Sequence, residues 1–175
     1  MAKGLYNKKD FITPDEERHL LRFINSQTWN NSLSRRTQHY GYEYNYRNNA
    51  TLKSAAPIPQ PLVEIKNRIE AYLQPSTDVN FDQCIVNEYI PGQGIAPHID
   101  HTGHFGPIVV SLSLGSSCTF EMYDPNSTVY DLFLEPRELL ILSEDARYVW
   151  KHAIPKSKSD RTGVRVSLTY RAVKK

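Results

Sequence analysis

The sequence predicts a mostly β fold, an antiparallel sandwich or jelly roll preceded by two helices. From residue 81 onward the chain consists of short apolar runs separated by turn signals, which is typical of antiparallel sheets rather than of a parallel β/α sheet. Before residue 81, two stretches carry apolar side chains at helical spacing. The length of 175 residues favours one domain, residues 1–175, with a single core.

The first predicted helix spans residues 14–25. Thr13 suits the N-cap, Pro14 suits the first helical position, and Glu16 completes a capping box. Its apolar face is formed by Leu20, Leu21, Phe23 and Ile24. The second predicted helix spans residues 62–73, with one apolar face formed by Leu62, Ile65, Ile69 and Leu73. Both helices are expected to pack against a sheet.

Between the helices, the segment RRTQHYGYEYNY (residues 35–46) has tyrosine at every second position from Tyr40 to Tyr46. This period predicts one strand with a face made of tyrosine. The face has two interpretations. It is either a half-buried sheet surface with its phenol groups in water, or a platform on which a base stacks.

Seven more strands are predicted in the remainder of the chain, at residues 81–89, 108–114, 118–123, 129–134, 138–142, 148–154 and 164–170. The last strand alternates polar and apolar residues. One face holds Arg165, Ser167, Thr169 and Arg171, and the other holds Val166, Leu168 and Tyr170. A buried row with two arginines requires an anion, and a dicarboxylate fits it. The alternative is a solvent-facing edge strand.

The stretch NEYIPGQGIAPHID carries candidate metal ligands. If it is extended, His98 and Asp100 point to the same side of a strand. One imidazole and one carboxylate are two of the three ligands of a 2-His-1-carboxylate Fe(II) site. His152, at the end of a predicted strand, is the candidate for the third. Asn87 and Tyr89 open the same stretch with the same spacing of two.

Composition limits the other possibilities. The net charge of +2 does not by itself argue for nucleic-acid binding, but two basic clusters lie at Arg35–Arg36 and at Lys151, Lys156, Lys158 and Arg161. Each is either a solvated rim or a phosphate contact. Two cysteines, the start MAKGLYNKKDF and the lack of an apolar run near about 20 residues predict a protein of the reducing cytoplasm or nucleus, without membrane contact.

These motifs together resemble the AlkB family of Fe(II) and 2-oxoglutarate-dependent dioxygenases, whose marks are N-x-Y, H-x-D, a distal His and R-x-N-x-T-x-R. Within the family the sequence is most similar to the oxygenase domain of the tRNA wobble-uridine hydroxylases, through RRTQHYGYEYNY, NEYIPGQGIAPHID, IVVSLSLGS and RYVWKHAI. The resemblance implies a double-stranded β-helix (jelly roll) core at residues 81–175. Residues 1–80 would supply helices packed on the major sheet and a nucleotide-recognition lid.

The resemblance also implies the cofactor and cosubstrate sites. Fe(2+) would be bound by His98, Asp100 and His152, with 2-oxoglutarate and O2 as cosubstrates. The 2-oxoglutarate would be bound by Asn87, Tyr89, Arg165, Ser167, Thr169 and Arg171. Arg165 would pair with its distal carboxylate, and Arg171 would lie near the end that chelates the metal. Ser167 replaces the family's Asn; because a hydroxyl can still donate one hydrogen bond, we expect weaker orientation rather than loss of binding.

One departure bears on the substrate. Family members that repair methylated adenine and cytosine commonly carry H-x-D-x-D, and the second Asp is Thr102 here. A hydroxyl cannot make the same charge-assisted contact with an exocyclic amine, so a modified wobble uridine in tRNA, methoxycarbonylmethyluridine, is the leading substrate. Substrate contacts are expected from Arg35, Arg36, Tyr42, Tyr44, His101, Thr102, Lys156 and Lys158.

Three alternatives stay open: oxidative demethylation of N-alkylated bases in RNA or DNA, a metal-containing jelly-roll module that binds nucleic acid without turnover, and hydroxylation of protein side chains. The wobble hydroxylases usually carry an RNA-recognition module and a methyltransferase domain as well, and neither fits in 175 residues. RNA affinity is therefore expected from the rim alone or from a separate methyltransferase or RNA-binding partner. The protein is expected to be a monomer.

Overall fold

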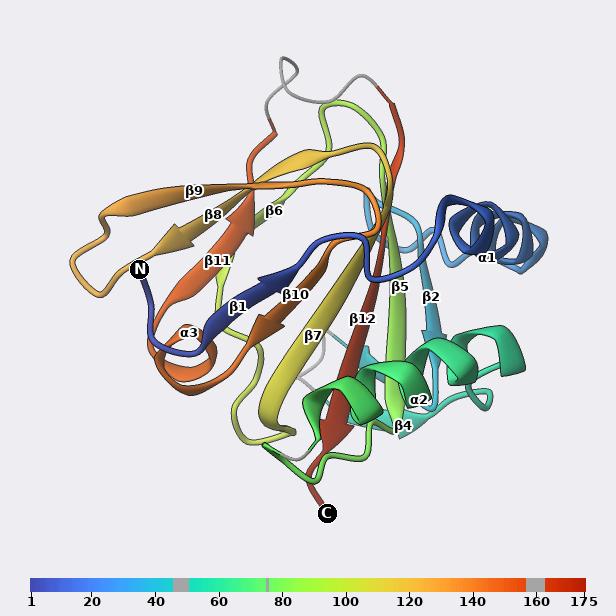
Figure 1. Cartoon of the computed structure of the whole chain (residues 1–175), viewed down its shortest axis with the longest axis horizontal. Coiled ribbons are helices and arrows are strands. Elements are labelled where there is room, and N and C mark those ends of the chain that lie inside the picture. The colour runs from blue at the N-terminus through green and yellow to red at the C-terminus, as the bar shows by residue number, and fades with distance from the viewer. Residues whose placement is uncertain (46–50, 75, 157–162) are drawn as a thin grey trace.

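Two antiparallel sheets form the body of the protein, seen in a computed structural model that describes residues 1–45, 51–74, 76–156 and 163–175 (Figure 1). The larger sheet has six strands in the order β1-β10-β7-β12-β5-β2, and the smaller has four in the order β6-β11-β8-β9. A two-stranded sheet pairs β3 with β4. The predicted mostly β, jelly-roll architecture is confirmed.

The larger sheet contains β1 (Leu5–Lys8), β2 (Thr37–Tyr40), β5 (Gln83–Tyr89), β7 (Phe105–Gly115), β10 (Leu139–Leu142) and β12 (Arg165–Val173). The smaller sheet contains β6 (Ile95–His98), β8 (Cys118–Tyr123), β9 (Val129–Leu134) and β11 (Lys151–Ile154). The separate pair is β3 (Tyr42–Asn45) and β4 (Thr51–Ser54). The predictions for 118–123 and 129–134 match the observed strands residue for residue.

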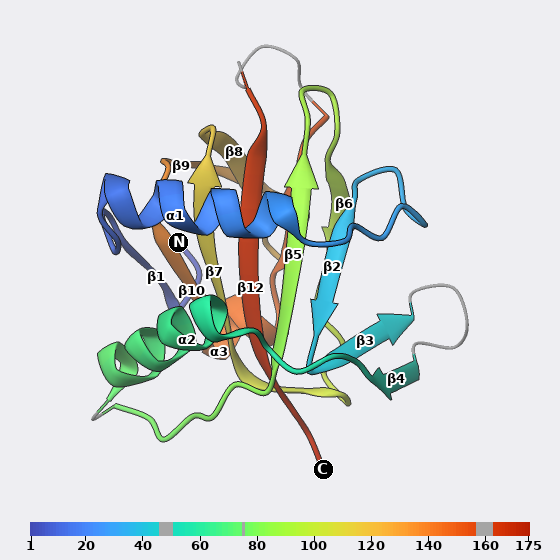
Figure 2. The same ribbon diagram turned by 90° about the vertical axis from the view of Figure 1, so that its right-hand side faces the viewer.

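Two helices lie across the outer face of the larger sheet, α1 (Pro14–Ser26) and α2 (Gln60–Leu73) (Figure 2). The predicted capping box is present: Glu16 N donates to Thr13 Oγ1 over 3.2 Å, and Thr13 N donates to the Glu16 carboxylate over 2.7 Å. Apolar side chains of both helices form one core with the sheet, including Leu20, Ile24, Leu62, Ile69, Leu112 and Leu168. The prediction that N-terminal helices pack on the major sheet is confirmed.

The two faces of β12 separate this core from the site. Val166, Leu168 and Tyr170 belong to the core beneath the helices. Arg165, Ser167, Thr169 and Arg171 line a pocket on the opposite face. β12 is paired with β5 on one side and with β7 on the other, so it is central in the sheet. The edge-strand interpretation of the arginine row is therefore wrong.

The prediction of one strand over residues 35–46 is also wrong. Gly41 has φ +75°, and a Cβ at this position would collide with the carbonyl oxygen of Asp82. The chain turns there, which separates β2 in the larger sheet from β3 in the small pair. Tyr40 consequently packs against the core beneath the helices, whereas Tyr44 contacts Phe105 with ring centroids 5.6 Å apart. Tyr46 lies outside the described residues.

The predicted elements do not include four short ones. β1, β4 and β6 have four residues each. The fourth is α3 (Glu144–Tyr148), which overlaps the start of the strand predicted over 148–154; the observed strand β11 begins only at Lys151. Among the helices described, none is long and apolar enough to cross a membrane.

Candidate active site

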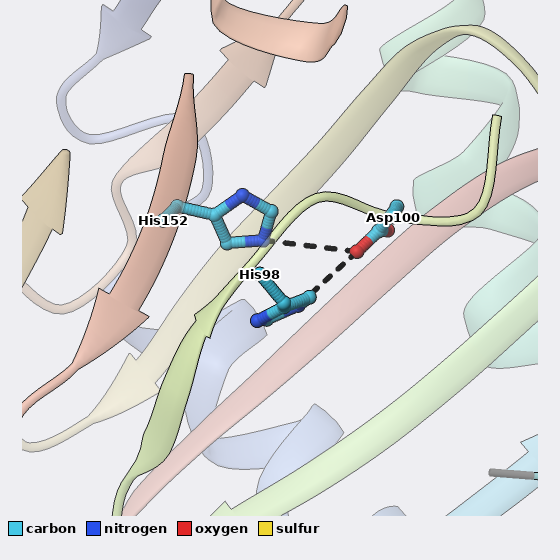
Figure 3. A group of neighbouring side chains, drawn as sticks. All are labelled: His98, Asp100 and His152. Carbon is cyan, nitrogen blue, oxygen red and sulfur yellow. Dashed lines mark ion pairs between the residues drawn. The ribbon is translucent and has the colours of Figure 1, made fainter. Parts of the chain in front are cut away.

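Three predicted metal ligands converge between the two sheets (Figure 3). His98 ends β6, and His152 lies directly opposite it on the neighbouring strand β11. Asp100 follows β6 by two residues. Its Oδ1 lies 3.3 Å from His98 Nε2 and 3.7 Å from His152 Nε2, and one possible ligand atom from each residue lies within 4.8 Å of the others. The geometry can hold one metal ion.

Hydrogen bonds and packing orient the two imidazoles. His98 Nδ1 lies 2.9 Å from the carbonyl oxygen of Ala96. A carbonyl only accepts, so the proton belongs on Nδ1, and the Nε2 lone pair faces Asp100. The ring of His152 stacks on Phe120 with centroids 5.5 Å apart and an interplanar angle of 12°. Both rings are thus held in place by the protein itself.

The charge states suit a cation. Burial lowers the pKa of His152 to about 4, helped by the neighbouring His98, so this imidazole is neutral at pH 7. Burial opposes ionisation of Asp100, but Arg171 and the two histidines outweigh it and hold the pKa of the carboxyl well below its usual range. Arg171 Nη1 donates to Asp100 Oδ2 over 3.0 Å and leaves Oδ1 toward the imidazoles. Neutral nitrogen and ionised oxygen are the forms that ligate iron.

A pocket of about 70 Å³ extends from these ligands along the inner face of the larger sheet. Its lining includes all six residues predicted to bind 2-oxoglutarate: Asn87, Tyr89, Arg165, Ser167, Thr169 and Arg171. Register explains this proximity, because Arg165 lies opposite Tyr89 and Ser167 lies opposite Asn87 in the β5–β12 pair. Two motifs far apart in the sequence therefore form one wall.

Arg165 supplies the test of fit for a dicarboxylate. Its side chain is 1% exposed, and its Nη2 donates to Ser113 Oγ over 2.9 Å. Among the described residues, its Nε and Nη1 have no hydrogen-bond partner. A buried guanidinium with two unsatisfied donors is expensive unless an anion meets it. A carboxylate at the inner end of this pocket would satisfy both donors, so the residues fit 2-oxoglutarate.

A wider mouth of about 520 Å³ adjoins the same candidate ligands, since His98 and Asp100 line both cavities. Four residues predicted to contact substrate line it: Arg35, Tyr44, His101 and Lys156. The ring of Tyr44 lies 6.3 Å from His101 and 6.1 Å from His104, measured between centroids. Aromatic rings therefore form one wall beside the metal ligands.

The remaining predicted substrate residues lie elsewhere. Tyr42, Thr102 and Arg36 are not among the residues that line the mouth. Arg36 pairs with Glu88 through Nε at 2.7 Å and Nη2 at 2.9 Å, and its guanidinium lies 4.4 Å from the ring centre of Trp29. The carbonyl oxygen of Thr102 accepts from Lys174 Nζ over 2.7 Å. Lys158, with Arg161 of the same basic cluster, lies outside the described residues.

No motif or spacing in the sequence singles out Arg147 of α3. It is 2% exposed, and its guanidinium donates to three backbone carbonyls, those of Asp100 at 2.8 Å, Gly106 at 3.1 Å and Phe105 at 3.2 Å. These bonds fasten the loop that carries Asp100 to the helix that precedes His152. Because the hydrogen-bond partners of Arg147 are backbone carbonyl oxygens, no particular side chains are needed at their positions, and the sequence pattern does not reveal the contact.

Residues 4–171 match the family model described as the 2OG-Fe(II) oxygenase superfamily. The chain belongs to this superfamily. Members use Fe(2+) and 2-oxoglutarate, in agreement with the three ligands and the arginine-lined pocket. The predicted class of enzyme, a 2-oxoglutarate-dependent oxygenase, is thereby confirmed.

Relatives of this oxygenase include AlkB homologues, which confirms the AlkB-family prediction. The chain is 37% identical to the "Alkylated DNA repair protein ALKBH8 homolog" of Arabidopsis thaliana, over 98% of the chain and 58% of that protein. It is 35% identical to the "tRNA (carboxymethyluridine(34)-5-O)-methyltransferase alkbh8" of Xenopus tropicalis, over 91% of the chain and 26% of that protein. The uncharacterized protein L905 of Acanthamoeba polyphaga mimivirus is 37% identical, over 94% of the chain and 82% of that protein.

The oxygenase thus spans less than two thirds of either ALKBH8 relative and most of L905. Among solved structures, that of OsALKBH1 has a TM-score of 0.80 at 19% identity and covers 98% of both chains. A prolyl hydroxylase from Trichoplax adhaerens has a TM-score of 0.68 at 12% identity, over 97% of this chain and 83% of that one. At such identities the likeness concerns the fold alone.

Proposed function

We propose that this oxygenase acts on RNA and hydroxylates the side chain of a modified wobble uridine, methoxycarbonylmethyluridine, in tRNA. The observation that carries the proposal is the lining of the mouth. Asp100 is the only acidic residue among the described residues that line it, and its carboxylate faces the two histidines and Arg171. The other ionisable groups there, Arg35, Tyr44, His101 and Lys156, are able to donate hydrogen bonds.

The base that suits such a mouth presents acceptors. Uracil offers two carbonyl oxygens, and the ester side chain adds another, whereas adenine and cytosine present an exocyclic amine that needs an acceptor. Tyr44 supplies an aromatic face for stacking, and an anticodon loop offers an unpaired base that can enter the mouth. The ALKBH8 relatives, one of which is named for wobble-uridine chemistry, support the same choice.

In this proposal His98, Asp100 and His152 hold Fe(2+), while the wall of β5 and β12 holds 2-oxoglutarate. Arg165 receives the distal carboxylate at its unsatisfied Nε and Nη1. Arg171 keeps Asp100 ionised through the contact at 3.0 Å. When bound, the iron and its cosubstrate supply the oxidation, in which O2 and 2-oxoglutarate yield succinate, CO2 and a hydroxylated C–H carbon. The chain's own share is orientation of the base and exclusion of water.

The test is incubation of the protein with Fe(2+), 2-oxoglutarate and total tRNA, followed by mass spectrometry of the nucleosides. The expected product is methoxycarbonylmethyluridine that has gained one oxygen atom. His152→Ala is the matched control, because it removes one ligand and should abolish both product and succinate. Loss of N-methylated bases with no change in uridines would instead support oxidative demethylation and refute the proposal.

The setting of this activity is also part of the proposal. Residues 1–80 would contribute the helices and lid and residues 81–175 the jelly-roll core of one oxygenase domain. Cys84 and Cys118 are buried free thiols, which suits a reducing cytoplasm or nucleus. We propose that the protein acts as a monomer, and that a separate RNA-binding or methyltransferase protein supplements the RNA affinity of the rim.

A further inference from the structure

We propose that Arg35 is the residue that selects for the substituent on the uridine, by donating hydrogen bonds to the oxygens of its carboxyl or ester group. This inference rests on the proposed function and adds a specificity determinant to it. Arg35 is 9% exposed, and it lines both the cosubstrate pocket and the substrate mouth. It therefore lies at the junction of the two, beside the metal ligands.

Arg35 is a buried cation, and no carboxylate among the described residues forms an ion pair with it. Its Nε donates to Asn87 Oδ1 over 3.0 Å. Within the described part of the chain it forms no other hydrogen bond and no ion pair. Its two Nη groups are thus available to a ligand that enters the mouth. A buried guanidinium of this kind is stabilised by a ligand that brings oxygen acceptors.

The other cations of the site have different partners or positions. Arg171 donates through Nη1 to Asp100 and through Nε to Gln83 Oε1 at 2.7 Å. Arg165 does not line the mouth, and Lys156 lies exposed at its rim. Arg36, next in sequence, is engaged by Glu88. Arg35 is consequently the guanidinium of the mouth that can form two parallel hydrogen bonds to a carboxyl group.

The chemistry of the substrate requires such a donor at this place. The carbon to be hydroxylated is the methylene between the uracil ring and the carboxyl carbon, so the carboxyl oxygens lie two bonds from the reacting carbon. A residue that binds them must adjoin the metal ligands, as Arg35 does. Its backbone is also held on both sides, because Gln93 Nε2 donates to Ser34 O over 2.6 Å and Glu88 N donates to Arg36 O over 3.0 Å. The fork is therefore preorganised.

The experiment measures binding of three anticodon stem-loops to the protein with Fe(2+) and 2-oxoglutarate in the absence of O2. They carry uridine, 5-carboxymethyluridine or 5-methoxycarbonylmethyluridine at the wobble position. The wild type should bind both substituted RNAs about 10- to 100-fold more tightly than the plain one, the range for a charge-assisted hydrogen bond. Arg35→Met should bind all three alike. Arg36→Gln is the matched control and should keep the wild-type ratio.

Arg35→Lys keeps the charge and can still reach Asn87, so it should retain part of the preference for the carboxylate; it also serves if Arg35→Met does not fold. If the Arg35 variants keep the wild-type ratio and weaken 2-oxoglutarate binding instead, the residue serves the cosubstrate and the inference is refuted. Admitting O2 and measuring products separates the two proposals. A wild type that oxidises no wobble uridine overturns both, whereas one that does so while Arg35→Met keeps its preference overturns only the assignment of Arg35.

Discussion

Arg147 offers the sharpest test of how the fold holds the metal ligands. Arg147→Ala would leave the carbonyl oxygens of Asp100, Phe105 and Gly106 without the donors that now reach them over 2.8, 3.2 and 3.1 Å. A buried polar group deprived of its partner costs about 1–3 kcal/mol, so three of them cost about 3–5 kcal/mol once water enters the vacated space. That is a large share of the roughly 5–15 kcal/mol that stabilises a domain. Arg147→Lys, which can keep some of these bonds, should lose only about 2 kcal/mol.

The assay compares urea unfolding of the metal-free protein with Mn2+ binding by calorimetry. We expect Arg147→Lys to bind the metal about 10-fold more weakly, because the loop that carries Asp100 loses its fixed position relative to His152. Arg137→Lys is the control, since Arg137 forms a comparable bond to Glu17 at 2.8 Å and does not line either pocket of the site. It should lose stability and keep metal affinity. Wild-type metal affinity in Arg147→Lys would show that Arg147 stabilises the fold without positioning the ligands.

Three other outcomes follow from the structure. Thr13→Ala should lower the free energy of unfolding in urea by about 1 kcal/mol, because it removes the N-cap of α1. Arg165→Gln should raise the KM for 2-oxoglutarate about 10- to 100-fold, because we propose that its guanidinium binds the distal carboxylate. The metal-free protein should lose stability as the pH falls from about 6.5 to 4, by at most about 3 kcal/mol. In that range His152 becomes protonated in the unfolded chain but stays neutral in the folded chain, where its pKa is about 4. His152→Gln should therefore flatten this part of the plot of unfolding free energy, measured in urea, against pH.

The proximity of the three candidate metal ligands and of the residues proposed for the cosubstrate could be predicted, because both sets are side chains at fixed spacings in the sequence. Alternation along β12 assigned its two faces correctly, since a central strand between helices and a polar pocket must present different residues to each. The same period failed at Gly41, where tyrosines continue to alternate across a residue with positive φ. A spacing of two residues indicates on which side of a strand the side chains lie, but it does not indicate where the backbone turns.

The substrate side shows the same limit in the pair Arg35 and Arg36. As neighbours in the sequence they formed one basic cluster with one predicted role, yet in the segment that leads into β2 their side chains reach different residues. Arg35 reaches Asn87 on the pocket face of β5, and Arg36 reaches Glu88, the next residue along that strand. Which arginine enters the site depends on the register between this segment and β5, in which Thr37 lies opposite Asn87. A shift of one residue would exchange the two roles. Strand pairing therefore decides that Arg35 is the cation proposed to select the substrate and that Arg36 is neutralised by Glu88. The residue type, arginine in both cases, does not reveal this pairing.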